Sequence, residues 1–83
     1  MEKIILYSKK NCSLCERAKK ILIEKKVKFE TVMFEENEEL VLSKAREIRN
    51  VNMPFAEIDG KLLNAQNTMI YIENIKKENV QNE

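Results

Sequence analysis

The chain has 83 residues, a formal net charge of +1, two cysteines and no histidine. Two cysteines cannot make the several disulfides that stabilise small secreted domains, and the apolar run at residues 4–7 is too short for a signal peptide or a membrane span. We therefore expect one cytoplasmic domain over residues 1–83, with residues 78–83 as a frayed tail and no membrane partner.

The first half of the chain predicts a strand, a helix and a second strand. Residues 3–8 are largely β-branched and apolar and lead into a polar cluster, which is typical of a buried strand that enters a loop. Residues 27–34 alternate between two faces and end apolar on both, which predicts a strand that is internal at one end. Between the strands, apolar residues recur at helical spacing up to about Lys25. These residues are Leu14, Ala18, Ile21 and Leu22.

The second half predicts a helix, a hairpin and a last helix. The acidic run at residues 35–39 precedes a helix over residues 40–49, and acids suit the amino end of a helix dipole. Asp59-Gly60 separates Phe55–Ile58 from residues 61–64, and both turn residues tolerate positive φ, which indicates a β-hairpin. A last helix over about residues 67–77 carries its apolar residues on one face. These residues are Met69, Ile72 and Ile75, with Ile70 beside them.

The elements follow the order β-α-β-α-β-β-α. A β-α-β opening implies two parallel strands joined by a right-handed crossover, and an added hairpin gives a mixed four-stranded sheet flanked by three helices. We therefore predict an α/β protein with the thioredoxin fold. Pro54 lies directly before the hairpin, where it can begin an edge strand without the loss of a ladder hydrogen bond.

Cys12 and Cys15 carry the sharpest functional signal, because they lie where the first strand passes into the first helix. Two cysteines three positions apart at a helix start bring their sulfurs within disulfide reach, and the free N–H groups of the first turn stabilise a thiolate on the earlier one. We therefore assign Cys12 as the nucleophile. Cys15 lies one turn further in, near the buried face, and is assigned to resolve the mixed disulfide.

Other interpretations of this segment stay open. The cysteines could be two small buried hydrophobes, or half of a zinc site whose other ligands come from another chain or a small thiol. Ser13 and Glu16 match a capping box, which would start the helix at Leu14. Lys9 and Lys10 on the approach loop could favour the thiolate or attract an anionic substrate, and they could equally be solvated loop residues.

Residues 7–19, with the sequence YSKKNCSLCERAK, resemble the active-site segment of the glutaredoxins. Met53-Pro54 followed by residues 58–61 resembles the proline and hairpin segment of the same family, and the resemblance spans nearly the whole chain. It implies the thioredoxin fold and redox activity. It also implies a cis Met53-Pro54 bond that faces the Cys12 sulfur, where the Met53 backbone pairs with an extended substrate.

The resemblance further indicates residues that bind substrate, glutathione in particular. The family's Gly-Gly and the aspartate after it are absent, and Asn64-Ala65 and a neutral segment stand in their places. Ser13-Leu14 likewise replaces the Pro-Tyr that usually separates the cysteines. Lys9 and the Met53 main chain match two of the family's usual contacts to glutathione. Asn67 or Thr68 could replace the aspartate as a neutral hydrogen-bond donor. With the proline, the candidate set is Lys9, Met53, Pro54, Asn67 and Thr68.

We expect a glutaredoxin-like thiol-disulfide oxidoreductase that reduces protein disulfides by a dithiol mechanism. Its partners would be disulfide-containing proteins and, as the source of electrons, glutathione or a thioredoxin-reductase-like flavoenzyme. We expect a monomer with no bound cofactor or metal. Few aromatic residues accompany the basic ones, so we expect no nucleic-acid partner. The alternative is a binding module in which Cys12 shares a cluster or metal between two copies of the chain.

Overall fold

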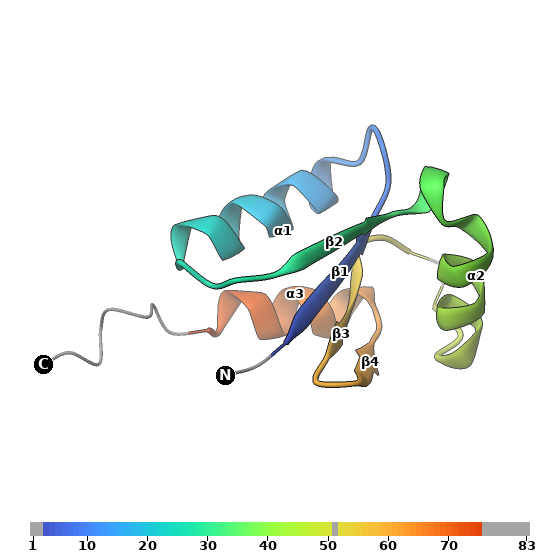
Figure 1. Ribbon diagram of the computed structural model, residues 1–83. Coiled ribbons are helices and arrows are strands. Elements are labelled where there is room, and N and C mark those ends of the chain that lie inside the picture. Colours follow the sequence, from blue (N-terminus) through green and yellow to red (C-terminus); the bar gives the residue numbers. More distant parts are fainter. Residues whose placement is uncertain (1–2, 51, 76–83) are drawn as a thin grey trace, which may run out of the picture.

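The computed structural model describes residues 3–50 and 52–75 and shows the predicted order of elements (Figure 1). A short 3₁₀ helix, η1 (Phe34–Glu36), lies between the second strand and the second α-helix. The predicted end of the last helix at residues 76–77 and the predicted frayed tail at 78–83 lie outside the described residues. The elements are β1 (Ile4–Ser8), α1 (Ser13–Glu24), β2 (Glu30–Met33), η1 (Phe34–Glu36), α2 (Glu38–Glu47), β3 (Phe55–Ile58), β4 (Lys61–Leu63) and α3 (Ala65–Glu73).

The four strands form one mixed sheet in the order β2-β1-β3-β4. Strand β1 runs parallel to β2 and antiparallel to β3, and β3 pairs with β4 as the predicted hairpin. Asp59 and Gly60 in the turn both have positive φ, at 50° and 86°. The sheet and its three α-helices confirm the predicted thioredoxin fold.

The placement of Pro54 corrects the expectation of an edge strand. Strand β3 lies inside the sheet, between β1 and β4. Its ladder with β1 begins at the pair Tyr7 and Phe55, one residue after the proline. Pro54 therefore lies outside the ladder, and its missing N–H costs no hydrogen bond there.

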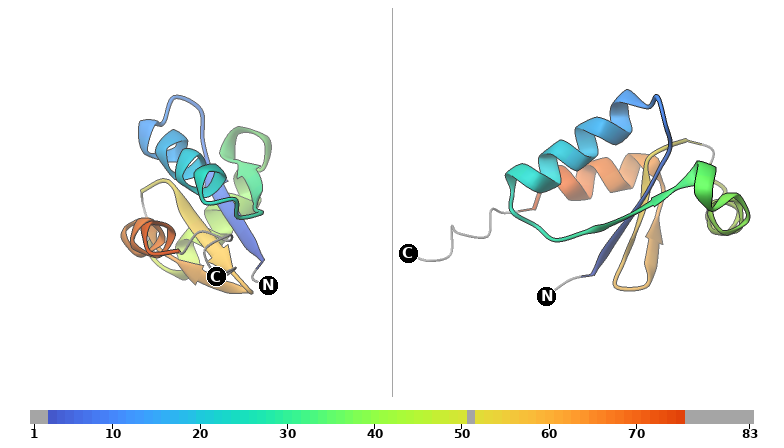
Figure 2. Two further views of the ribbon diagram at one scale, coloured as in Figure 1. Left: turned by 90° about the vertical axis from the view of Figure 1, so that its left-hand side faces the viewer. Right: turned by 45° about the horizontal axis from the view of Figure 1, so that its top comes forward.

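The helices cover the sheet on both faces, with α1 and α3 on one side and α2 on the other (Figure 2). The core beneath α1 and α3 is built from Ile4, Leu6, Ala18, Leu22, Ala56 and Ile72. The core beneath α2 is smaller and is built from Tyr7, Val41 and Phe55. Both cores meet at the central strands β1 and β3, which removes these strands from solvent and makes them a fixed base for the segments that follow them.

Three elements begin two or more residues away from their predicted starts. Strand β2 begins at Glu30 rather than at residue 27, and its first residue pairs with Ile5 of β1. Helices α2 and α3 each begin two residues earlier than predicted, at Glu38 and Ala65. Val27 and Phe29 still pack on the α1 side, whereas Val32 and Phe34 pack on the α2 side, as the alternation predicted. Leu14, which was expected on an apolar helix face, is half exposed at 52%, and so is Ile70, which was expected beside such a face, at 50%.

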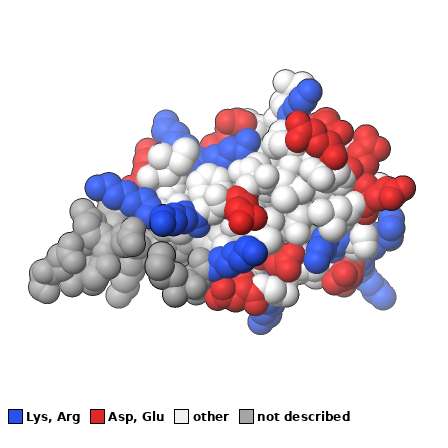
Figure 3. Space-filling model, in the orientation of Figure 1, with Lys and Arg blue, Asp and Glu red and all other residues white. Residues whose placement is uncertain are grey.

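Charges of both signs are spread over the face drawn in Figure 3, and acidic side chains gather toward the end that carries η1 and α2. This end holds the acidic run at residues 35–39. Glu35 and Glu36 lie in η1, and Glu38 and Glu39 lie in the first turn of α2, where their charge complements the helix dipole. No helix in the described part of the chain is long and apolar enough to cross a membrane.

Candidate active site

Cys12 caps the amino end of α1. Its backbone is extended, with φ −124° and ψ 106°, and its sulfur accepts the Cys15 N–H at 3.2 Å. The Glu16 N–H bonds to the Cys12 carbonyl at 3.1 Å, which is the first bond of the helix. The predicted capping box is therefore wrong: the helix starts at Ser13, and the Glu16 carboxylate pairs with Lys19 instead.

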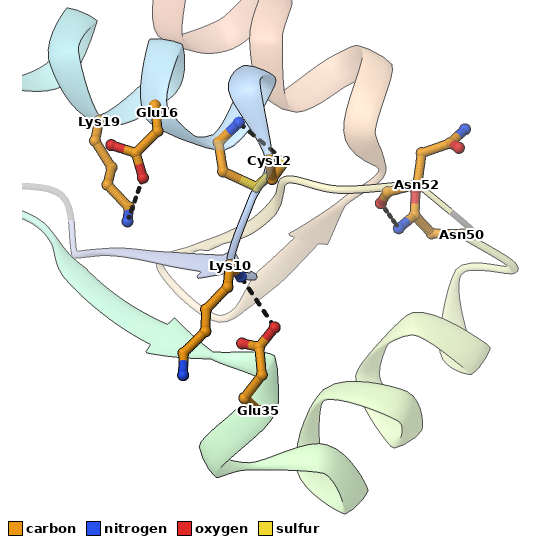
Figure 4. Close-up of a disulfide and its surroundings, with 8 residues drawn as sticks. Lys10, Cys12, Glu16, Lys19, Glu35, Asn50 and Asn52 are labelled. Carbon is orange, nitrogen blue, oxygen red and sulfur yellow. Dashed lines mark hydrogen bonds and ion pairs between the residues drawn. A yellow bond between two sulfur atoms is a disulfide. The ribbon is translucent and has the colours of Figure 1, made fainter.

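The two cysteines are joined as a disulfide, with their Cα atoms 5.2 Å apart (Figure 4). Cys15 is fully buried, and Cys12 is partly exposed. This difference follows from their positions, since Cys12 precedes the helix and Cys15 lies on the helix face that packs on the sheet. As expected, Cys12 is the more exposed of the two cysteines.

A hollow of about 300 Å³ opens at Cys12, and we call it the cysteine hollow. Lys9 and Met53, which the family resemblance indicated as substrate-binding residues, both line it. The Met53-Pro54 peptide bond is cis, as the resemblance also implied. Pro54 itself is fully buried and is not among the residues that line the hollow. The lining consists of Lys9, Asn11, Cys12, Ser13, Leu14, Asn52 and Met53.

The loop before Cys12 is tied to η1. The Lys10 N–H donates to a Glu35 carboxylate oxygen at 3.0 Å (Figure 4). This hydrogen bond, with the charges of Lys10 and Lys9, holds the pKa of Glu35 below its usual range. The carboxylate is therefore ionised at neutral pH, and it fixes a loop whose next residue, Asn11, adopts positive φ.

A second anchor joins the loop that carries Met53 to α3. Asn50 accepts the Ala65 N–H through Oδ1 at 2.9 Å. It also donates to the Asn52 carbonyl through Nδ2 at 2.6 Å (Figure 4). Asn64 caps α3, and its Oδ1 accepts the Asn67 N–H at 2.8 Å. Two N–H groups at the start of α3 are thus already bound by asparagine side chains.

The two residues predicted as neutral hydrogen-bond donors, Asn67 and Thr68, differ in their exposure to solvent. Thr68 is fully buried, and its hydroxyl donates to the Leu63 carbonyl at 3.2 Å. Its side chain is therefore not open to a ligand, which corrects the expectation for this residue. Asn67 is exposed, but it lines neither the cysteine hollow nor the small polar hollow beside it, of about 190 Å³. That polar hollow is lined by Arg49, Asn50, Asn52, Asn64, Ala65 and Gln66.

Sequence reasoning missed Asn50 and Asn64, and it missed an apolar groove of about 430 Å³ between α2 and the sheet. Asn64 could have been found, because asparagine is a preferred N-cap residue and lies just before the helical stretch. Asn50 carried no such local signal. Among the described residues, no three His, Cys, Asp or Glu side chains gather in a way that could hold a metal ion.

Comparison with known proteins places this geometry in context. The family model described as Glutaredoxin matches residues 4–63. A mutant of the thioredoxin-like protein BC3987 superposes with a TM-score of 0.71 at 20% identity, over 92% of this chain and 100% of that one. Glutaredoxin 1 from Francisella tularensis, complexed with cacodylate, gives a TM-score of 0.66 at 14% identity, over 89% of this chain and 94% of that one. No match is found among curated proteins.

Proposed function

The chain belongs to the glutaredoxin family, and we propose that it reduces disulfides in proteins by a dithiol mechanism through Cys12 and Cys15. Family membership and the cysteine pair at the start of α1 fit thiol-disulfide redox activity in general. One observation supports the finer assignment: the more exposed sulfur, that of Cys12, accepts the Cys15 N–H at 3.2 Å. After reduction of the Cys12–Cys15 disulfide, a thiolate at this position would be accessible and would have a hydrogen-bond donor in place.

The reaction has two exchange steps. The Cys12 thiolate attacks one sulfur of the substrate disulfide, so that a Cys12–substrate disulfide forms and the other substrate sulfur leaves as a thiolate. Cys15 then loses its proton and attacks the Cys12 sulfur, which releases the second substrate thiolate. The substrate gains two electrons and two protons, and the protein is left as the Cys12–Cys15 disulfide.

The surrounding residues orient the substrate rather than react with it. Met53 lines the cysteine hollow, and its main chain can pair with an extended substrate segment as an added strand. Lys9 lines the same hollow and can attract a carboxylate. Both segments are held by hydrogen bonds from elsewhere in the chain, since Glu35 fixes the loop after Lys9 and Asn50 fixes the loop before Met53.

The disulfide must be reduced again by two electrons. Two glutathione molecules or a thioredoxin-reductase-like flavoenzyme can supply them, and we propose that the flavoenzyme serves better. Asn50 and Asn64 already occupy N–H groups at the start of α3, where this family's Gly-Gly and aspartate would hold glutathione. We further propose that the protein acts in the cytoplasm as a monomer, without a bound cofactor.

The test is insulin reduction by the full chain, supplied in turn with glutathione and its reductase and with thioredoxin reductase. Cys12→Ser should lose all activity, because the first attack cannot occur. Cys15→Ser should accumulate a mixed disulfide through Cys12, which mass spectrometry detects. Equal dithiol activity in the two variants would refute the assignment. A brown dimer with Cys12 as a ligand would instead favour the alternative of a shared cluster.

A further inference from the structure

The apolar groove between α2 and the sheet, which we call the α2 groove, is larger than the cysteine hollow and differs from it in chemistry. Its volume is about 430 Å³. Its floor is rigid, because Phe55 is buried and stacks on Tyr7 with ring centroids 4.7 Å apart. The apolar lining consists of Phe34, Val41, Leu42, Ala45, Met53 and Phe55.

The α2 groove adjoins the cysteine hollow, which Cys12 lines. Lys9 and Met53 line both the groove and the cysteine hollow, so the two spaces share a wall. A polypeptide joined to Cys12 through its own cysteine therefore has its neighbouring residues at the mouth of the groove. Since the Met53 main chain is the expected partner of an extended segment, a side chain next to the substrate cysteine is within reach of this apolar lining.

The charged side chains that line the α2 groove are both basic. They are Lys9 and Arg46, and no acidic residue of the described part of the chain lines the groove, although acids lie nearby in η1 and in the first turn of α2. Lys44, on the same helix, is already paired with Glu57 at 3.4 Å on the β3 side. Arg46 thus presents a positive charge at the rim, and an incoming carboxylate would be attracted rather than repelled.

We propose that the α2 groove binds a bulky apolar side chain that lies beside the reactive cysteine of the substrate protein, with a carboxylate of the same segment against Arg46. This inference rests on the proposed function and narrows its substrate class. Glutathione fills the groove poorly, because the tripeptide has no large apolar side chain to bury against the apolar lining. The preferred substrates are therefore protein segments in which an aromatic or large aliphatic residue adjoins the disulfide cysteine.

The test uses pre-reduced protein and peptides that each contain one internal disulfide, in single-turnover reactions that need no electron donor. The peptides differ at two positions only. The residue directly before or directly after the cysteine is Phe or Ser, and one further position is Glu or Lys. The wild type should reduce the better-placed Phe peptide about tenfold faster than its Ser counterpart, as partial burial of an aromatic side chain implies. Glu peptides should react faster than Lys peptides, and Arg46→Gln should lower that ratio.

Leu42→Ser removes part of the apolar lining and should reduce the preference for Phe. Leu40→Ser is a matched control, because Leu40 lies on the same helix, is exposed to the same degree (45% against 44%) and does not line the groove. Ala45→Phe is a second variant that fills the groove and should abolish the preference. Circular dichroism checks that each variant folds.

The outcomes separate the inference from the proposed function. If the wild type reduces none of the peptides, the proposed function fails and the groove loses its role with it. If the wild type reduces Phe and Ser peptides at equal rates, or if Leu42→Ser and Ala45→Phe both keep the full preference, the groove is not a substrate site although the protein is a reductase. A preference lost in these two variants and kept in Leu40→Ser supports the inference.

Discussion

Asn50→Ala should detach the loop that carries Met53 from the start of α3. The substitution removes two hydrogen bonds, one from the Ala65 N–H at 2.9 Å and one to the Asn52 carbonyl at 2.6 Å. Each such bond stabilises a folded protein by about 0.5–1.5 kcal/mol, so the pair is worth about 1–3 kcal/mol. In a domain of this size, each kcal/mol changes the Tm by about 4–8 °C, and we expect the Tm to fall by at least about 4 °C.

Asn52→Ala is the matched control, because the Asn52 side chain is exposed and the substitution keeps the carbonyl that accepts the bond. Its free energy of unfolding should stay within about 0.5 kcal/mol of the wild type. Amide hydrogen exchange gives a local readout: the Ala65 N–H should exchange faster in Asn50→Ala and keep its protection in Asn50→Asp, whose carboxylate can still accept it. Equal Tm values for Asn50→Ala and Asn52→Ala, with unchanged exchange at Ala65, would refute this account of the loop.

Two further predictions concern groups whose pKa the fold shifts. Burial, assisted by the hydrogen bond to Glu57, raises the pKa of Tyr7, so the stability that Tyr7 contributes is full below about pH 10 and is lost as the pH rises further. Urea unfolding should show Tyr7→Phe less stable than the wild type at pH 7 by about 1.5–3 kcal/mol, with a smaller difference above pH 10; a constant difference would contradict this. The Lys10 hydrogen bond lowers the pKa of Glu35, so its contribution is present above the ordinary glutamate pKa and is lost as the pH falls through the lowered value. In an NMR titration, the Lys10 amide should follow the Glu35 carboxylate and lose its pH response in Glu35→Gln.

The fold could be predicted because its signals are local. The hairpin turn needs two residues that tolerate positive φ, and Asp59-Gly60 supplies both. The period of the apolar residues distinguishes helix from strand, and the spacing of Cys12 and Cys15 at a strand-to-helix junction identifies the reactive pair. Each of these signals lies within a few residues and depends little on what packs against it.

The rest of the site depends on contacts between distant segments. The α2 groove joins Lys9, Phe34 and residues of α2 and β3, and no short motif encodes that meeting. Asn50 binds Ala65 across 15 positions of the sequence. Thr68 was assigned to the site although it does not reach it. The sequence suggested that its hydroxyl could donate to a ligand, but α3 turns the hydroxyl onto the sheet, where the Leu63 carbonyl accepts its hydrogen bond. Only the packing of α3 decides which of its polar residues reach solvent.

Glutathione should bind weakly and mainly through long-range attraction. The N–H groups of Ala65 and Asn67 already donate hydrogen bonds to the side chains of Asn50 and Asn64. A ligand carboxylate at the start of α3 must therefore displace one of these side chains before it can accept a hydrogen bond there. The attraction that remains comes from exposed cations, chiefly Lys9 and the Arg49 of the polar hollow. Such attraction is screened beyond about 10 Å at 0.1 M salt and more strongly as salt rises.

The measurement is a chemical-shift titration of Cys15→Ser with glutathione at low and high salt. We expect a Kd of about 1 mM or weaker at low salt and no saturation at high salt. Asn64→Gly in the same background should tighten binding, because glycine is an acceptable N-cap residue and the substitution frees the Asn67 N–H for the ligand. Tight, salt-insensitive saturation without this substitution, with shifts centred on residues 64–68, would contradict the argument. It would mean that Asn50 and Asn64 bind glutathione rather than occupy the N–H groups that glutathione needs. Glutathione would then replace the flavoenzyme as the proposed source of electrons.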